Sequence, residues 1–189
     1  MSARRLLLLG PPGVGKGTQA LRLARELSVP QISTGDMLRD AVARKSEVGK
    51  CAKNAMEQGE LVADAIVIRV ARERLTQDDA CAGFILDGFP RTHEQARALD
   101  EMLGELGTPL ERCVAITAEE GVLVERLLER AKTEGRSDDN EATIRNRMQV
   151  YHEETAPLAS YYSEQGLLRD VDGTGSIEEV ADRIQGALQ

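Results

Sequence analysis

The stretch LGPPGVGKGTQ, residues 9–19, decides the fold, because it turns the apolar run RRLLLL into a glycine-rich loop and then into a helix. Residues 10–16 fit the pattern G-x-x-x-x-G-K. Glycines let backbone N–H groups turn toward an anion, and the helix N-terminus adds partial positive charge. An ordinary Gly-Pro turn would leave Lys16 and the second pair of glycines unused. The stretch therefore predicts a phosphate-binding loop, with Lys16 reaching the terminal phosphates.

This loop departs from the usual pattern in one place. Gly17 stands directly after the lysine, where a hydroxyl residue is usual, and Thr18 comes one place later. A second motif, FILDGFPRT at residues 84–92, ends an apolar run in Asp87. The carboxyl edge of an α/β sheet is where ligands bind. We therefore expect Asp87 to hold Mg²⁺ through water, and we expect no direct hydroxyl ligand from the loop.

Short apolar runs alternate with helical spacing along the chain, which predicts an α/β fold with a parallel sheet. The expected strands are 6–9, 29–32, 84–86, 113–116 and 167–171. Helical spacing marks 20–27, 99–106 and 177–188, and Ser176 and Glu179 have the spacing of a capping box. Two stretches do not fit the alternation: a long mixed segment at 33–62, and a short polar connection expected at 131–135.

Composition limits the class of protein. With 189 residues, 41% of them hydrophobic, the chain can bury one sizeable core. No apolar run approaches the length of a membrane span, so we expect a cytoplasmic protein. A net charge of −8 argues against a nucleic-acid partner. The three cysteines lack paired zinc-ligand spacing, so we expect them to be reduced and structural, with no zinc.

Several arginines border apolar positions near the expected connection. Arg126 and Arg130 share one helical face beside Leu123 and Leu127, and Arg147 lies beside Met148. Arginine suits phosphoryl transfer, because its planar fork binds phosphate oxygens bidentately and keeps its charge when enclosed.

The acidic pair that follows Arg136 has two interpretations. Asp138 and Asp139 either cap the next helix or hold the neighbouring arginines through ion pairs. Cap statistics favour the first interpretation for at least one of them.

Long motifs in the chain resemble those of the adenylate kinase family. They are GPPGVGKGTQ, ISTGDMLRDAV, GELVAD, ILDGFPRT with EQA, GRSDDNEATIRNRM and YHEETAPL. The resemblance implies reversible phosphoryl transfer from MgATP to AMP, giving two ADP and serving adenine nucleotide homeostasis. It also implies one domain of the P-loop three-layer class with a five-stranded parallel sheet, acting as a monomer without a membrane or nucleic-acid partner.

The same resemblance divides the chain and assigns its site residues. The implied core is 1–32, 63–128 and 140–189, with a mobile AMP-binding segment at 33–62 and a short mobile lid at 129–139. The residues implied for ATP are Gly13, Val14, Gly15, Lys16, Gly17, Thr18, Arg126, Arg130 and, through its backbone, Gly175. Those implied for AMP are Thr34, Arg39, Glu60, Leu61, Val62, Gly88, Phe89, Pro90, Arg91, Gln95, Arg136 and Arg147. The implied catalytic set is Lys16, Arg91, Arg130, Arg136 and Arg147.

The acceptor base separates the remaining alternatives. The side chain of Gln95 offers both a donor and an acceptor to N1 and N6 of adenine. A UMP/CMP kinase is the alternative, and it would be expected to show alanine and asparagine at Thr34 and Gln95. A GTP-dependent switch would need an N-K-x-D motif, which does not occur. A non-catalytic nucleotide sensor would not require the intact set of cationic residues.

Overall fold

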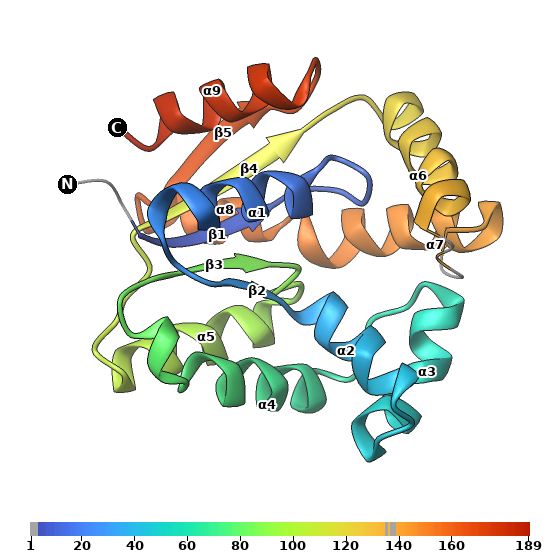
Figure 1. Ribbon diagram of the computed structural model, residues 1–189, viewed down its shortest axis with the longest axis horizontal. Coiled ribbons are helices and arrows are strands. Elements are labelled where there is room, and N and C mark those ends of the chain that lie inside the picture. The colour runs from blue at the N-terminus through green and yellow to red at the C-terminus, as the bar shows by residue number, and fades with distance from the viewer. Residues whose placement is uncertain (1–3, 135, 137–138) are drawn as a thin grey trace.

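In the computed structural model, which describes residues 4–134, 136 and 139–189, the strands form one five-stranded parallel sheet. Its order is β2-β3-β1-β4-β5 (Figure 1). The strands are β1 (Arg5–Leu9), β2 (Gln31–Ser33), β3 (Phe84–Asp87), β4 (Arg112–Thr117) and β5 (Leu168–Asp172). The α/β fold and the parallel sheet predicted from the sequence are confirmed.

The register of the sheet brings the two sequence motifs together. Leu8 of β1 is level with Asp87 of β3, and Asp87 is level with Ser33 of β2. Because parallel strands end at the same edge, the glycine-rich loop after β1 lies beside the segment that follows Asp87. Motifs separated by about 70 residues along the chain therefore meet at one edge of the sheet.

Alternate residues of β1 face two separate cores. Leu7 and Leu9 belong to one hydrophobic cluster, and Leu6 and Leu8 belong to the other. This period of two is that of a strand covered on both faces. Figure 1 shows α4 (Asp64–Leu75) and α5 (His93–Glu105) below the sheet, with α1 (Lys16–Leu27) and α9 (Ile177–Ala187) on the opposite side.

The remaining helical elements extend these layers and the carboxyl edge of the sheet. They are α2 (Thr34–Ala43), α3 (Glu47–Gln58), η1 (Asp78–Ala80), α6 (Glu120–Glu134), α7 (Glu141–Val150), the π-helical turn η2 (Tyr151–Thr155) and α8 (Leu158–Glu164). The helical spacing found in the sequence corresponds to α1, α5 and α9, and the capping box of Ser176 and Glu179 is present. Among the described residues, no helix is both long and apolar enough to cross a membrane.

The expected polar connection at 131–135 is wrong in its position. Helix α6 continues to Glu134, so the connection comes later, between α6 and α7. The physical reason is that Ala131, Lys132 and Glu134 favour helix, and a polar composition alone does not end one. Asn140 caps α7 by accepting a hydrogen bond from the Thr143 N–H at 3.0 Å, so Asp139 is not the cap of this helix, and Asp138 lies outside the described residues.

Helix α3 ends against α7, far along the chain. The Thr143 hydroxyl donates to the Glu57 carbonyl at 3.3 Å, and the Asn146 amide donates to the Gln58 carbonyl at 2.9 Å. These bonds satisfy carbonyl groups that a helix end leaves without intrahelical partners. The α2–α3 segment is therefore attached at one end to the helix that follows the α6–α7 connection (Figure 1).

Candidate active site

The glycine-rich loop turns its backbone toward the carboxyl edge of the sheet. Its last residue before α1 is Gly15, with φ of 97°, and no side chain caps the helix. No acidic residue lies in the first turn of α1. The loop also packs tightly, because a Cβ on Gly13 would lie 2.8 Å from the Leu123 carbonyl oxygen of α6. The first-turn amides of α1 are thus placed to bind an anion.

Lys16 begins α1 and lies inside this loop. Its Nζ donates to the carbonyl oxygens of Gly10 and Pro11, at 2.7 and 2.9 Å. Desolvation lowers the pKa of Lys16 to about 8, a shift that Asp87 opposes and that Arg91, Arg147 and Arg130 reinforce. Three arginines therefore converge on Lys16 closely enough to affect its titration.

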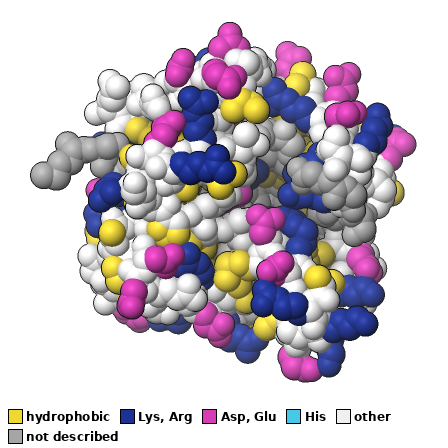
Figure 2. All heavy atoms as spheres, in the orientation of Figure 1, with side chains coloured by type: hydrophobic (Ala, Val, Ile, Leu, Met, Phe, Trp, Pro, Cys, Tyr) yellow, Lys and Arg dark blue, Asp and Glu magenta, His cyan; other side chains and the backbone are white. Residues whose placement is uncertain are grey.

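A large cleft of about 800 Å³ opens over the loop. Its lining includes all of the residues expected for ATP and all of the predicted phosphate-binding arginines. These are Gly13, Val14, Gly15, Lys16, Gly17, Thr18, Gly175, Arg126, Arg130, Arg136, Arg147, Arg39 and Arg91. On the face drawn in Figure 2, acidic and basic side chains are interspersed among the described residues. Positive charge is thus gathered in the cleft, although the chain as a whole carries −8.

The far side of the large cleft is formed by the loop between β5 and α9. Arg126 donates to the Gly173 carbonyl there, at 3.2 Å. Gly175 has a φ of +103°, and a Cβ at this position would lie 2.5 Å from a carboxylate oxygen of Glu179. Since Glu179 is fixed by the capping box, the position favours glycine and offers a ligand only backbone atoms.

Asp87 lies at the end of β3 and lines the large cleft. Its Oδ2 accepts a hydrogen bond from Gln31 at 3.3 Å and would be 3.4 Å from a Cβ on Gly17. A single carboxylate beside a phosphate loop suits Mg²⁺, which binds few protein ligands and keeps several waters. Among the described residues, no group of three His, Cys, Asp or Glu side chains is arranged to hold a metal ion.

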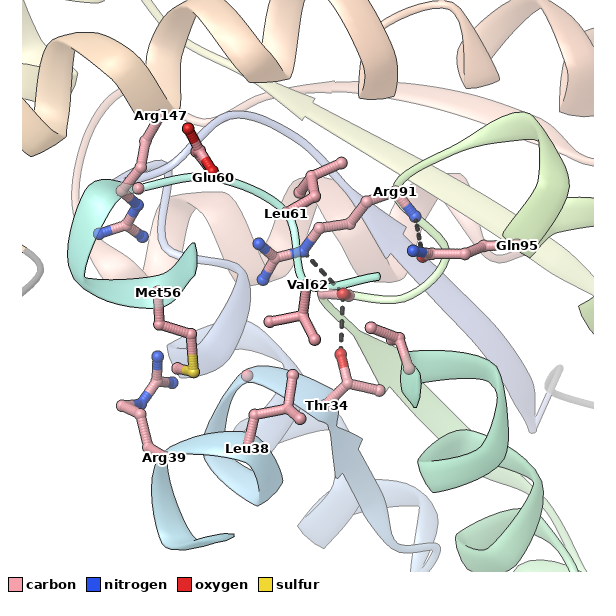
Figure 3. Close-up of a pocket in the computed structure, with 14 residues that line it drawn as sticks. Thr34, Leu38, Arg39, Met56, Glu60, Leu61, Val62, Arg91, Gln95 and Arg147 are labelled. Carbon is pink, nitrogen blue, oxygen red and sulfur yellow. Dashed lines mark hydrogen bonds between the residues drawn. The ribbon is translucent and has the colours of Figure 1, made fainter. Parts of the chain in front are cut away.

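A small pocket of about 60 Å³ lies between α2, the segment after α3, and the segment after β3 (Figure 3). The expected AMP residues that line it are Thr34, Arg39, Glu60, Leu61, Val62, Gly88, Arg91, Gln95 and Arg147. Hydrogen bonds tie its wall together: the Gly88 carbonyl accepts from the Thr34 hydroxyl at 2.9 Å and from Arg91 Nε at 2.8 Å. Leu38 and Met56 add an apolar side to the pocket.

Three expected AMP residues do not line this pocket, and one of them, Arg136, lines the large cleft instead. Phe89 is fully buried in the hydrophobic core, and Pro90 lines a middle pocket of about 80 Å³ instead. The middle pocket is also lined by Lys16, Arg91 and Arg147. Arg91 and Arg147 line the small pocket, the middle pocket and the large cleft alike. These two arginines therefore connect the two places where nucleotides would bind.

Asp139 is the fully buried partner of two arginines. Its carboxylate accepts from Arg130 Nε at 2.7 Å and from Arg147 Nη1 at 2.6 Å. Burial alone would raise the pKa of Asp139, but the hydrogen bond and charge of Arg130, with the charges of neighbouring arginines, hold it below its ordinary value. Asp139 thus holds two arginines through ion pairs, which is the second of the two interpretations of the acidic pair. Asp138 lies outside the described residues.

Arg39 and Arg136 are associated with a second carboxylate. Arg39 donates to Asp36 within α2. Burial alone would raise the pKa of Asp36, but hydrogen bonds from Arg39 and Ser33 and the charges of Arg39 and Arg136 lower it. The charge of Arg136 contributes to the lowered pKa of both Asp36 in α2 and Asp139 in the connection between α6 and α7.

The cysteines differ from one another in exposure. Cys113 is buried in β4, and desolvation raises its pKa, whereas Cys51 and Cys81 are exposed. The structural role expected for all three therefore fits only Cys113.

The sequence did not predict three side chains that hydrogen-bond to residues of the site. Gln31 contacts Asp87, and Thr155 of the π-helical turn donates to the Arg91 carbonyl at 2.9 Å. Asp64 contacts Gln95, although the two residues are 31 positions apart. Asp64 and Thr155 lie inside motifs that the sequence analysis singled out, GELVAD and YHEETAPL. Neither motif indicates which distant residue such a side chain contacts.

Comparison with known proteins agrees with this geometry. A family model described as adenylate kinase matches residues 8–167. An adenylate kinase of Thermobifida fusca is 51% identical over 185 residues, which is 98% of this chain and 98% of that protein. One of Xanthomonas euvesicatoria pv. vesicatoria is 52% identical over 184 residues, 97% of this chain and 98% of that protein. One of Leptospira biflexa is 51% identical over 181 residues, 96% of this chain and 97% of that protein. The chain therefore belongs to the adenylate kinase family.

Proposed function

We propose that this protein transfers a phosphoryl group reversibly from MgATP to AMP, giving two ADP. ATP binds in the large cleft, with its phosphates on the loop from Gly13 to Thr18, and AMP binds in the small pocket. The observation that carries this proposal is that Arg91 and Arg147 line both cavities and the pocket between them. A phosphoryl group moving from one nucleotide to the other would pass these two guanidinium groups.

The residues supply charge and position rather than a covalent step. Lys16 exchanges its bonds to the loop carbonyls for the terminal phosphate oxygens of ATP, and Arg91, Arg130, Arg136 and Arg147 surround the transferred group. The attacking phosphate oxygen of AMP is already ionised at neutral pH, so no general base is required. Asp87 would hold Mg²⁺ through water, and the ion would supply positive charge beside the phosphates. Arg126 and the backbone of Gly175 contact the ATP side.

The division of the chain is part of the same proposal. The core is 1–32, 63–128 and 140–189, the AMP-binding segment is 33–62, and the short lid is 129–139, of which 135, 137 and 138 lie outside the described residues. Arg136 lines the large cleft together with Asp36 and Arg39 of α2, which supports a lid that meets the AMP-binding segment. We also infer that the active form is a monomer.

An acceptor panel tests the proposed function. The purified protein is incubated with MgATP and with AMP, CMP, UMP or GMP in turn, and ADP formation is measured. We expect AMP to be the best acceptor by a wide margin. A preference for CMP or UMP would favour a pyrimidine monophosphate kinase, and nucleotide binding without turnover would favour a sensor.

A further inference from the structure

Asp64 lies behind the wall of the small pocket, at the first position of α4. Its Oδ1 accepts a hydrogen bond from Gln95 Nε2 at 2.6 Å, and its Oδ2 accepts one from the Thr92 hydroxyl at 3.1 Å. Thr92 in turn caps α5 by accepting from the Gln95 N–H at 3.2 Å. Among the described residues, Gln95 lines the small pocket and Asp64 does not. Any effect of Asp64 on a ligand in that pocket must therefore pass through Gln95.

The Gln95 carboxamide has one orientation that satisfies both of its neighbours. The Arg91 N–H can only donate, and it lies 2.8 Å from Oε1 (Figure 3). The Asp64 carboxylate can only accept, and it faces Nε2. Rotating the amide by half a turn would place a donor against a donor and an acceptor against an acceptor. Since Gln95 is 1% exposed, water cannot easily relieve that conflict.

Two hydrogen-bonding positions of the carboxamide remain after these contacts. One N–H of Nε2 and one lone pair of Oε1 are still available to a ligand. A 6-aminopurine presents an acceptor at N1 and a donor at N6, whereas a 6-oxopurine presents a donor at N1 and an acceptor at position 6. The orientation that suits the first base opposes the second, so fixing the amide also fixes which purine is accepted.

We propose that Asp64 is a positioning residue that sets base selectivity by holding the Gln95 amide in the orientation suited to a 6-aminopurine. This inference rests on the proposed function, because it assigns the small pocket to the acceptor nucleotide. Asp64 does not touch the nucleotide. It determines, together with the Arg91 N–H, which end of Gln95 is the donor.

The test compares AMP with IMP, a monophosphate that differs from AMP only in its 6-oxo group and protonated N1. For the full-length protein with MgATP, kcat/KM is measured for each acceptor, and the AMP:IMP ratio is the readout. In Asp64→Ala we expect this ratio to fall by about tenfold, because only the Arg91 N–H then opposes rotation of the amide, while KM for ATP stays unchanged. Asp64→Ser provides a second variant that keeps a polar side chain at this position, but one too short to reach Gln95.

Two further variants separate positioning from a general structural effect. Asp64→Asn can still present an oxygen to Gln95 Nε2, so we expect it to keep a ratio closer to that of the wild type. Glu94→Ala removes a first-turn carboxylate from α5 at an exposed position, and we expect its ratio to be that of the wild type. If a folded Asp64→Ala or Asp64→Ser protein loses activity equally with AMP and IMP, the inference about Asp64 is wrong, but the proposed function stands. A wild-type protein without a preference for AMP would overturn the inference and the proposed function together.

Discussion

The small pocket is about 60 Å³ and is walled by side chains that hydrogen-bond to backbone groups of the wall or to Asp64 behind it, whereas the large cleft is about 800 Å³ and is lined by loop backbone and arginines. In the small pocket, the Thr34, Arg91 and Gln95 side chains each have a fixed partner before any ligand binds. In the cleft, Gly175 offers only backbone atoms to a base. Side chains with fixed donors and acceptors discriminate between bases, whereas backbone amides and cations recognise phosphate.

The largest expected effect is in the cleft. Lys16→Met should reduce kcat by about 100- to 1,000-fold, because it removes a point charge from the transferred phosphate while the glycine turn remains. Activity is measured by coupled ADP detection, and circular dichroism checks the fold. Lys50→Met, at an exposed position on α3, is the matched control. Near-wild-type turnover by a folded Lys16→Met protein would contradict the assignment of the loop.

The next effect is in the small pocket. Gln95→Ala should raise KM for AMP, because the base loses one pair of hydrogen bonds worth about 1–3 kcal/mol of binding free energy. The same variant should discriminate less well among nucleoside monophosphates. KM for ATP should change little, because Gln95 is absent from the described lining of the large cleft. The comparison variant is Gln165→Ala, whose amide contacts Asp100 on the surface. If KM for ATP rises instead, the division between the two cavities is wrong.

Asp139 lies where the two regions meet, so its loss should affect both. Asp139→Asn leaves Arg130 and Arg147 without their buried carboxylate, which should lower stability by about 2 kcal/mol and Tm by about 4–8 °C. Because the pKa of Asp139 is below its ordinary value of 3.8, the stabilisation is full above that value. It is lost as pH falls through the folded-state pKa.

Thermal unfolding of both proteins from pH 7 to pH 3 measures this effect. The difference between wild type and Asp139→Asn should be constant near neutrality and should shrink below about pH 4. A difference that stays constant down to pH 3 would show that Asp139 acts by packing rather than by charge.

A smaller effect is that nucleotide affinity should depend on pH in the large cleft but not in the small pocket. Because the pKa of Lys16 is about 8 in the free protein, ATP binding above pH 8 requires proton uptake. The affinity for ATP should therefore fall by up to about tenfold per pH unit there. AMP affinity should stay level, because arginines do not titrate in this range.

The lowered pKa of Lys16 also makes the free energy of unfolding depend on pH. The unfolded chain binds more protons at Lys16 between pH 8 and 10.5, so this group adds stability as pH rises through that window. Calorimetric titration of each nucleotide from pH 7 to 10 tests the binding prediction, with Lys16→Met as the variant in which the ATP slope should vanish. Equal slopes for ATP and AMP would remove the distinction between the two regions.

The last prediction is that removal of zinc has no effect on either region. A chelator selective for zinc over magnesium should change neither Tm nor activity, because the cysteines lack zinc-ligand spacing. Thermal melts and ADP assays with and without the chelator, with added Mg²⁺ as the control, give the comparison. A loss of Tm would show that metal supports one of the two regions.

Sequence reasoning placed the strands well and their edges less well. The run 6–9 became β1 almost unchanged, because four consecutive leucines suit a strand covered on both faces. The strand expected at 29–32 begins instead at Gln31. Val29 donates to the Ala24 carbonyl at 3.0 Å and so completes the end of α1, and Pro30 has no N–H to offer the sheet.

The site could be predicted where a residue's role is local. The loop of Lys16 follows from contiguous residues, and so does the place of Asp87 at a strand end. The role of Asp139 depends on Arg130 and Arg147 converging on one buried carboxylate, and sequence statistics favoured a cap. The contact of Asp64 with Gln95 joins residues 31 positions apart and could not be read from either motif.

The position of β1 in the sheet has a consequence for synthesis. It is synthesised before the other strands of this sheet, yet its two neighbours are β3 and β4, which end at Asp87 and Thr117. Until those residues emerge, both edges of an apolar strand are open in the nascent chain. Folding of this sheet therefore cannot proceed strand by strand in the order of translation, and the growing chain has to keep its leucines from pairing with other chains until more than half of its length has been made.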